Sequence, residues 1–365
     1  MSPRPPPPAD QLPVAFFARL VAWQRHSGRH GLPWQGTRDP YRVWLSEIML
    51  QQTQVSTVLD YYPRFLARFP DVHALAAAHP DDVMALWSGL GYYSRARNLH
   101  RCAQVVVGEH GGRFPERAVD LQQLPGIGAS TAAAIAAFCS GERISILDGN
   151  VRRVLGRLLA FGDDLARAGA QQRLWEMAQS LLPAQVDAAD MVAYTQGLMD
   201  LGATLCARSR PDCGRCPVQD LCRARAQDAV SAYPVRSRAV RRQSVSWWLL
   251  LCRRPGSGSW QLGLQRRPAA GIWAGLHCPP VFDAEEALME AVPAAWRHRM
   301  KDLPVLAHSL THRELRLHPW LLDLPEDLVE LDGLLEGLAG LRWVDDQALE
   351  AVGLPAPVRQ LLQSL

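Results

Sequence analysis

The sequence predicts a mainly α-helical N-terminal part followed by a smaller α+β domain. With 365 residues, of which 48% are hydrophobic, the chain is long and apolar enough for two domains that each bury a core. Between about residues 14 and 222, apolar residues recur at the three-to-four spacing of amphipathic helices. From about residue 244, short apolar runs alternate with Gly, Pro and Ser segments, a pattern typical of strands and turns.

The first 13 residues are predicted to form a disordered tail. The opening run MSPRPPPPAD is rich in proline and lacks the apolar stretch of a signal peptide, so we expect a cytoplasmic protein. No apolar run approaches the length of a membrane span. We therefore expect a protein that does not bind membranes. We also expect it to be a monomer.

Residues 14–222 contain the predicted helices, with breaks where Gly and Pro cluster, at His110–Pro115 and Leu124–Gly128. Helical spacing is present in six segments: Val14–Trp23, Tyr41–Leu59, Ala74–Trp87, Ser94–Val107, Ser130–Cys139 and Leu174–Leu182. Residues 223–243 are rich in arginine and are predicted to be a solvated linker. In the C-terminal domain, residues 244–365, the predicted strands are Val245–Cys252, Leu262–Leu264, Leu303–Ala307 and Leu315–Leu322.

Four cysteines within 17 residues, spaced C-x6-C-x2-C-x5-C, predict a metal centre. They are Cys206, Cys213, Cys216 and Cys222. Disulfides would need an oxidising compartment, which no secretory signal indicates. Zinc is an alternative, although zinc sites usually use two tight C-x2-C-type pairs and this window has one. Four soft thiolates on unevenly spaced loops favour a 4Fe–4S cluster.

The sequence Leu124–Gly128 (LPGIG) precedes the helix predicted from Ser130. Two glycines around an apolar residue permit a tight turn whose N–H groups, with those of the next helix N-terminus, can bind one phosphate. An ordinary helix–helix turn is the alternative. Combined with the cysteine window, the motif favours a helix-hairpin-helix that binds a nucleic-acid backbone.

Two acidic residues stand out from the surface acids. The predicted helix Tyr41–Leu59 places Glu47 on one face with Trp44, Leu50, Gln51 and Gln54. A carboxyl among apolar side chains is poorly solvated, which raises its pKa. Asp148 directly precedes the periodic segment Val151–Leu159, where it is either a helix N-cap or a functional carboxylate. For Glu47 the alternative is a partly exposed helix acid.

Three segments resemble MutY-type adenine DNA glycosylases: Leu45–Val55 (LSEIMLQQTQV), Gly89–Leu99 (GLGYYSRARNL) and Ile146–Val151 (ILDGNV). The hairpin and the cysteine spacing resemble the wider endonuclease III superfamily. Gly271–Leu276 (GIWAGL) is similar to the Nudix-like domain of the same family. The resemblance implies two helical lobes with the active site between them, an iron–sulfur loop at 206–222 and a Nudix-like domain at 244–365.

The resemblance also implies the residues of the active site. Glu47 matches the general acid that protonates adenine at N7, and Asp148 matches the carboxylate that stabilises the oxocarbenium sugar. Asn150 and Ser130 match positions that order the site, although some members have Tyr where Ser130 stands. The residues implied to line the adenine pocket are Trp34, Leu50 and Gln196.

A further set of residues is implied to contact DNA. It comprises Gln51, Gln52, Thr53, Leu90, Tyr92, Gly126, Gly128 and Arg152. Gln52 and Tyr92 match side chains that insert into the duplex beside the base opposite adenine, since an amide and an aromatic ring can both stack there. Ordinary core packing is the alternative for Tyr92.

In the C-terminal domain, Leu310, Thr311 and His312 match a loop that contacts 8-oxoguanine, with Leu310 where the family often has Phe. The acids that follow Gly271 are Glu285, Glu286 and Glu290. They do not form the R-E-x-x-E-E cluster that holds Mg²⁺ in Nudix hydrolases. We therefore predict lesion recognition here, and not pyrophosphohydrolysis.

The sequence thus predicts a monofunctional adenine DNA glycosylase of base excision repair. Its expected partner is double-stranded DNA with A:8-oxoguanine or A:G mispairs, in a bacterial nucleoid. The alternatives are a bifunctional endonuclease III-like pyrimidine glycosylase/lyase, a catalytically silent lesion-binding protein and, more distantly, a Nudix hydrolase. Lyase chemistry needs a lysine after the hairpin, where Ser130 stands, and of 39 Lys and Arg residues only Lys301 is a lysine. The presence of both Glu47 and Asp148 argues against a silent protein.

Overall fold

A computed structural model describes residues 12–237, 243–256, 259–310, 312–325 and 340–365 of the chain. The chain divides into two compact units. The first contains residues up to Ala76 together with Arg101–Arg238, and the second contains Ala77–His100 and Ala239–Leu365. Residues 1–11 of the predicted tail lie outside the described part.

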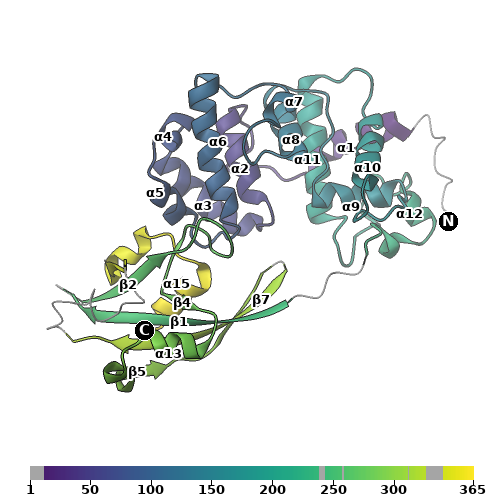
Figure 1. Ribbon diagram of the computed structural model, residues 1–365. Coiled ribbons are helices and arrows are strands. Elements are labelled where there is room, and N and C mark those ends of the chain that lie inside the picture. Colours follow the sequence, from purple (N-terminus) through teal and green to yellow (C-terminus); the bar gives the residue numbers. More distant parts are fainter. Residues whose placement is uncertain (1–11, 238–242, 257–258, 311, 326–339) are drawn as a thin grey trace. The chain divides into compact units, whose positions relative to one another are not determined.

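The first unit is built from α-helices (Figure 1). The helices that lie wholly in it are α1 (Leu12–Ser27), α2 (Pro40–Leu50), α3 (Val55–Arg68), α4 (Val72–Ala76), α7 (Ala118–Leu121), α8 (Ala129–Cys139), α9 (Gly149–Leu158), α10 (Ala170–Ser180), α11 (Ala188–Thr204) and α12 (Arg223–Ala226). Helix α6 (Ser94–His110) runs from one unit into the other. The prediction of a mainly helical N-terminal part is confirmed.

Helix α11 lies at the centre of the first unit, where it contacts α1, α8 and α9. Tyr194 of α11 is fully buried and stacks on Phe17 of α1, with ring centroids 5.0 Å apart. At the other end of α11, a Cβ on Gly202 would lie 2.8 Å from the Cβ of Asn150. The glycine therefore allows α11 to approach the first turn of α9, which carries residues of the candidate site.

The predicted helix Tyr41–Leu59 is wrong, because the chain breaks it into two. Helix α2 ends at Leu50 and α3 begins at Val55. Between them Gln52 has φ 56°, in the left-handed region that few residues other than glycine adopt. Gln51 and Gln54 therefore do not extend the helical face that carries Glu47.

Two further differences from the predicted helices have simple causes. The segment Ala74–Trp87 is also two helices, because Pro80 starts α5 (Pro80–Trp87) at a position that suits proline's fixed φ. Helix α11 was not predicted. Buried residues occur on several sides of this helix, so it lacks the single apolar stripe that marks an amphipathic helix.

Residues 223–237 fold onto the first unit, in contrast to the expected solvated linker. They form α12 and the 3₁₀ turn η1 (Val230–Ala232). The backbone N–H of Leu165 donates to the carbonyl of Val235 at 3.2 Å, and the Arg157 Nε donates to the carbonyl of Tyr233 at 3.2 Å. Residues 238–242 of the expected linker lie outside the described residues.

The second unit contains a mixed sheet. Its described strands are β1 (Gln243–Pro255), β2 (Trp260–Arg266), β3 (His277–Cys278), β4 (Val281–Phe282), β5 (Met300–Asp302), β6 (Leu306–Ser309), β7 (Arg313–Asp323) and β8 (Arg342–Asp345). Strands β1 and β7 pair in parallel, and the other pairs are antiparallel, in the order β3-β2-β1-β7-β5 with β4 on β1, β6 on β7 and β8 on β2. Helix α13 (Glu285–Ala291) packs on β1 and β4. The α+β prediction is confirmed.

The segment Ala77–His100 belongs to the same compact unit as the C-terminal domain, and side-chain hydrogen bonds join the two. Ser88 Oγ donates to the carbonyl of Leu354 at 2.7 Å, and the Tyr93 hydroxyl donates to the same oxygen at 3.1 Å. Arg359, on α15 (Ala356–Gln363), donates from Nη2 to Ser88 Oγ at 3.1 Å and to the carbonyl of Val352 at 2.9 Å. The end of α5 and the start of α6 therefore belong to the same compact unit as the sheet.

No helix in the described part of the chain is both long and apolar enough to cross a bilayer.

Replacing Arg359 with Met should destabilise the second unit. The change keeps the apolar stem but leaves Ser88 Oγ and the Val352 carbonyl without the donors, at a cost of about 1–3 kcal/mol. Urea unfolding of the full chain measures the loss. Arg316→Met, at an exposed position of β7, is the control and should shift the transition by less than about 0.5 kcal/mol. Equal effects of the two substitutions would contradict this account.

Candidate active site

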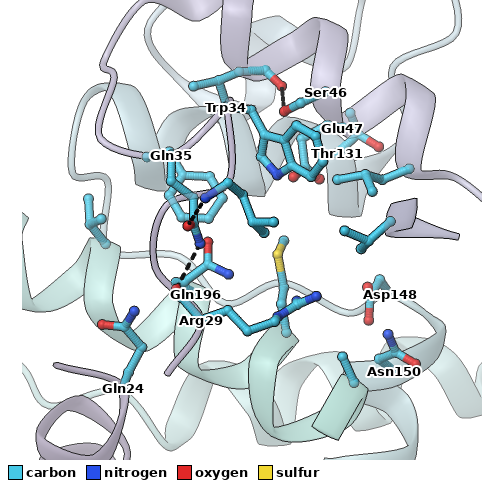
Figure 2. A pocket seen from close by; sticks show the side chains of 18 of the residues that line it. Gln24, Arg29, Trp34, Gln35, Ser46, Glu47, Thr131, Asp148, Asn150 and Gln196 are labelled. Carbon is cyan, nitrogen blue, oxygen red and sulfur yellow. Dashed lines mark hydrogen bonds between the residues drawn. The ribbon is translucent and has the colours of Figure 1, made fainter. Parts of the chain in front are cut away.

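The first unit encloses a cavity of about 1240 Å³. Its lining comes from the end of α1 and the loop after it, from α2 and the turn into α3, from α8, from the start of α9 and from α11. Ligand pockets for small molecules are commonly 300–1,000 Å³, so this space has room for a base with its sugar. Figure 2 shows the side chains around it.

Glu47, on α2, faces this cavity and keeps some exposed surface there (Figure 2). The protein around the carboxyl nevertheless removes most of its water, and this burial raises the pKa of Glu47 to about 8. The negative charge of Asp148 is the second cause of the raised pKa. Glu47 is therefore protonated at neutral pH and can act as an acid.

Asp148 is the N-cap of α9, and it also faces the same cavity as Glu47. The role as an N-cap therefore does not remove its carboxyl from the candidate site. One carboxylate oxygen accepts from the backbone N–H of Val151 at 2.6 Å. Burial raises the pKa of Asp148, whereas the N–H groups of Val151 and Asn150 and the charge of Arg152 oppose that rise. A negative charge on Asp148 raises the pKa of Glu47, so Glu47 keeps its proton more firmly when Asp148 is a carboxylate.

The predicted residues next to Asp148 support its position. Ser130 lines the cavity, and its Oγ accepts from the backbone N–H of Leu147 at 3.0 Å, which ties α8 to the segment that carries Asp148. Asn150 also lines the cavity and accepts from Arg153 Nη2 at 2.9 Å. Arg152 donates from Nε to the carbonyl of Asp148 at 3.3 Å. Because the Ser130 Oγ accepts from the Leu147 backbone, Ser130 supports the segment that carries Asp148.

The residues predicted to form the adenine pocket line the same cavity. Trp34 is 8% exposed and packs edge-on against Tyr62, with ring centroids 5.5 Å apart. Leu50 and Gln196 also line the cavity. An indole, an isobutyl group and an amide together offer apolar contact and hydrogen bonding, as a flipped base requires.

The turn after α2 brings three of the predicted DNA-binding residues to the mouth of the cavity. Gln51 donates from Nε2 to Thr131 Oγ1 at 3.2 Å, which joins the end of α2 to α8. Gln52 is exposed in its left-handed conformation, and Thr53 donates its N–H to the carbonyl of Leu50 at 3.3 Å. A positive φ at a residue other than glycine is typical of functional sites.

Of the other predicted DNA-binding residues, Arg152 lines the cavity, whereas Leu90, Tyr92, Gly126 and Gly128 do not. In the hairpin between α7 and α8, Gly126 has φ 77°, Gly128 is the N-cap of α8, and both are exposed. Tyr92 is 43% exposed with φ 49°, whereas Leu90 is only 6% exposed and its side chain is part of the core. The structure thus gives no support to a Leu90 side chain that contacts DNA.

Two of the three predicted lesion-reading residues, Leu310 and His312, lie between β6 and β7. The backbone N–H of Leu310 donates to the carbonyl of Arg313 at 2.8 Å and closes the turn. His312 is exposed and Leu310 is half-buried. Thr311 lies outside the described residues.

The four cysteines of the predicted metal centre line one small cavity of about 30 Å³, between α9 and the 206–222 segment. The Cys206 sulfur accepts from Arg157 Nη1 at 3.4 Å. Among the described residues, no group of three or more His, Cys, Asp or Glu side chains is arranged to hold a metal ion.

One residue that lines the cavity and one that lies behind it were not predicted from the sequence. Arg29 lines the cavity, and its Nε donates to Asp200 at 2.7 Å. Asp200 is completely buried on α11, directly behind Gln196. No motif marks either residue, but an acid within the apolar run from Met191 to Leu201 is a signal that could have drawn attention to Asp200.

Comparison with known proteins agrees with this arrangement. Residues 45–180 match the family model described as HhH-GPD superfamily base excision DNA repair protein, and residues 246–364 match the NUDIX domain. The structure of a thermostable thymine-DNA glycosylase aligns with a TM-score of 0.52 and 26% identity, covering 60% of this chain and 98% of that one. A non-covalent endonuclease III–DNA complex aligns with a TM-score of 0.50 and 18% identity over 61% and 99%. Fold and site thus define the class of helix-hairpin-helix base-excision proteins.

Full-length relatives narrow the class to one family. The adenine DNA glycosylase of Buchnera aphidicola subsp. Acyrthosiphon pisum is 33% identical over 359 residues, which are 96% of this chain and 97% of that protein. The human adenine DNA glycosylase is 46% identical over 221 residues, 58% of this chain and 40% of its own. The chain belongs to the adenine DNA glycosylase family, with a helix-hairpin-helix region and a C-terminal NUDIX domain.

Replacing Glu47 with Gln should stabilise the protein at alkaline pH. The Glu47 pKa is about 8 in the folded state against about 4.5 in the unfolded chain, so wild-type stability falls as the pH rises from 4.5 through 8. An amide cannot ionise, so the free energy of unfolding of Glu47→Gln does not fall in this way. At pH 8.5 the variant should gain on the order of 3 kcal/mol relative to the wild type. Urea unfolding at pH 5 and pH 8.5 measures the difference.

The control is Glu109→Gln, because Glu109 is exposed on α6. The free energy of unfolding of Glu109→Gln should change with pH in the same way as that of the wild type. If Glu47→Gln also runs parallel to wild type, the carboxyl is not held neutral by the fold.

Proposed function

We propose that the protein removes adenine from A:8-oxoguanine and A:G mispairs by hydrolysis of the N-glycosidic bond, without cutting the DNA strand. The observation that carries this proposal is that two carboxyl groups line one cavity, and that burial together with the charge of Asp148 raises the pKa of Glu47 to about 8. Glycosidic cleavage needs an acid for the leaving base and a negative charge beside the developing sugar cation. Membership of the adenine DNA glycosylase family supports adenine as the base.

Glu47 is the general acid in this proposal. The bond between C1′ of the sugar and N9 of adenine breaks, and its electron pair stays with adenine, which takes up the Glu47 proton at N7. Asp148 lies near the sugar as a carboxylate, where its charge stabilises the oxocarbenium ion. Water then adds to C1′, and the proton it releases replaces the one that Glu47 gave. The products are free adenine and an abasic site.

Water is the proposed nucleophile because the helical unit has no lysine side chain for covalent chemistry. The sequence contains a single lysine, Lys301, which lies on β5 in the other unit. Ser130 stands at the position where a lyase of this superfamily would need a lysine, and its oxygen supports the Leu147 backbone.

DNA is the proposed partner, bound through the hairpin and the exposed turns. The N–H groups at Gly126–Gly128 and the start of α8 can meet a phosphate, because a helix N-terminus favours negative charge. Gln52 and Tyr92 are exposed with positive φ and are the proposed wedges. At the β6–β7 turn, His312 is the described exposed side chain proposed to read 8-oxoguanine, together with Leu310 and Thr311.

We also infer a 4Fe–4S cluster at Cys206, Cys213, Cys216 and Cys222. The support is that four thiols line one apolar-walled cavity beside buried residues of α9 and α11, a donor set that suits iron and sulfide. When bound, the cluster would fasten the 206–222 segment to α9 and so stiffen a surface beside the DNA. The proposed proton transfers involve Glu47 and Asp148 alone.

Glu47→Gln should lower the single-turnover rate of adenine release by at least about 10²-fold, because the amide keeps the shape of the acid but delivers no proton. Asp148→Asn should be similarly severe, because a neutral amide stabilises a cation poorly. The assay compares A:8-oxoguanine, A:G and A:T duplexes at one salt concentration, since phosphate contacts make affinity salt-dependent. The wild type should release adenine from the first two and little from the third.

Binding to A:8-oxoguanine duplex should stay within a few-fold of wild type in Glu47→Gln, and Glu109→Gln should behave as wild type in both assays. A near-normal rate in either active-site variant would refute the role assigned to that carboxyl.

Anaerobically purified protein should contain about four irons and four acid-labile sulfides per chain and should absorb visible light. Cys213→Ser should lower the iron content, whereas Cys139→Ser, at a free cysteine outside the window, should leave it unchanged. Metal analysis and the visible spectrum measure both. A colourless protein with stoichiometric zinc would overturn the assignment.

A further inference from the structure

A buried carboxylate lies directly behind the cavity wall, and the proposed chemistry gives it no role. Asp200 has no exposed surface and does not line the cavity. Its Oδ2 accepts from the backbone N–H of Arg29 at 2.9 Å, and its Oδ1 accepts from Arg29 Nε at 2.7 Å and from Gln196 Nε2 at 2.8 Å. Arg29 and Gln196 are both cavity residues, as Figure 2 shows.

Asp200 determines which end of the Gln196 amide is available to a ligand. A carboxylate oxygen can only accept a hydrogen bond, so Gln196 must turn its NH₂ group towards Asp200. No residue in the described ranges donates to the Gln196 Oε1. The polar atom that Gln196 has left for a ligand in the cavity is therefore an acceptor.

The same carboxylate places donors beside that acceptor. Arg29 and Gln196 both donate to one oxygen atom, so their head groups converge. Arg29 uses its Nε and backbone N–H for Asp200, and its Nη groups make no hydrogen bond to any described residue. A guanidinium has only donors, so the wall carries an acceptor next to donors.

The backbone is shaped to allow this contact. A Cβ on Gly28 would lie 3.0 Å from the Asp200 Oδ2 and 2.5 Å from the carbonyl oxygen of Gln24. Only a residue without a side chain lets the Arg29 N–H reach the carboxylate there. Asp200 is thus held by three donors and by the absence of a side chain at Gly28.

We propose that Asp200 is a positioning residue that sets the base selectivity of this cavity. The Watson–Crick edge of adenine has a donor, the 6-amino group, next to an acceptor, N1, which complements the Gln196 acceptor and the Arg29 donors. Hypoxanthine and guanine present the reverse order, a 6-oxo acceptor next to an N1–H donor. Against a fixed Gln196 acceptor the 6-oxo group meets a second acceptor, and in a site with little water that mismatch is costly. This inference rests on the proposed function.

Asp200→Asn in the full-length protein tests the proposal. An asparagine amide can donate to the Gln196 Oε1, so Gln196 becomes free to turn and present its NH₂ group. The measurement is the ratio of single-turnover release rates for adenine and for hypoxanthine, each opposite 8-oxoguanine. The ratio should fall about tenfold in Asp200→Asn, because one imposed mismatch is relieved and one match is lost.

Asp190→Asn is the matched control. It is the same substitution on the same helix, at a residue that pairs with Arg25 at 2.6 Å and does not line the cavity. The ratio should stay at the wild-type value. A ratio is the readout because loss of folded protein lowers both rates together and leaves the ratio unchanged.

Gln196→Met provides a second route if Asp200→Asn does not fold. Removing the acceptor should lower the ratio to a similar extent, and adding Asp200→Asn to it should change the ratio no further. A folded Asp200→Asn or Gln196→Met protein with the wild-type ratio overturns the proposal. Wild-type protein that releases neither base overturns the proposed function and the inference together, whereas adenine release with unchanged ratios overturns the inference alone.

Discussion

Removal of water from the Glu47 carboxyl is the constraint on which the site depends. In water this group would be ionised at neutral pH and could not donate a proton. Packing of α2 against α8 places it at the wall of a cavity, and the Asp148 charge adds to the effect, so the pKa rises to about 8. Burial is the larger cause of the raised pKa of Glu47, and the charge of Asp148 is the second.

The two carboxyls come from segments about 100 residues apart in the chain, and α8 and α11 bring them together. Helix α8 contacts both α2 and α11, and α11 contacts α9, whose first turn carries Asp148 at its N-cap. Small residues make these contacts possible, as at Gly202 against Asn150. The contacts among α2, α8, α11 and α9 thus place Glu47 and Asp148 at one cavity.

The boundary between the two units does not follow the boundary that the sequence pattern indicates. Helical periodicity and the family resemblance both assign residues 77–100 to the helical region, yet Ser88, Tyr93 and Arg359 join this segment to the C-terminal domain. The exposed Tyr92 lies in that segment. The C-terminal domain is therefore in a position to influence a proposed DNA contact through packing, in addition to any contact of its own at the β6–β7 turn.

The sequence by itself determined the two-part fold, the family and the chemical residue types, because apolar periodicity and short motifs such as LSEIMLQQTQV and the cysteine spacing are local features. It also indicated Glu47 and Asp148 as candidate site residues, since an acid inside a motif can be recognised without knowing its neighbours. Local patterns could not show that Tyr41–Leu59 breaks at Gln52, because apolar spacing does not report a positive φ at a residue other than glycine. Nor could they show Asp200 behind Gln196, since α11 is apolar on most of its surface and Arg29 approaches from about 170 residues away. Only the tertiary structure decided which polar groups share a cavity, because desolvation and hydrogen-bond direction arise from residues that are distant in the chain.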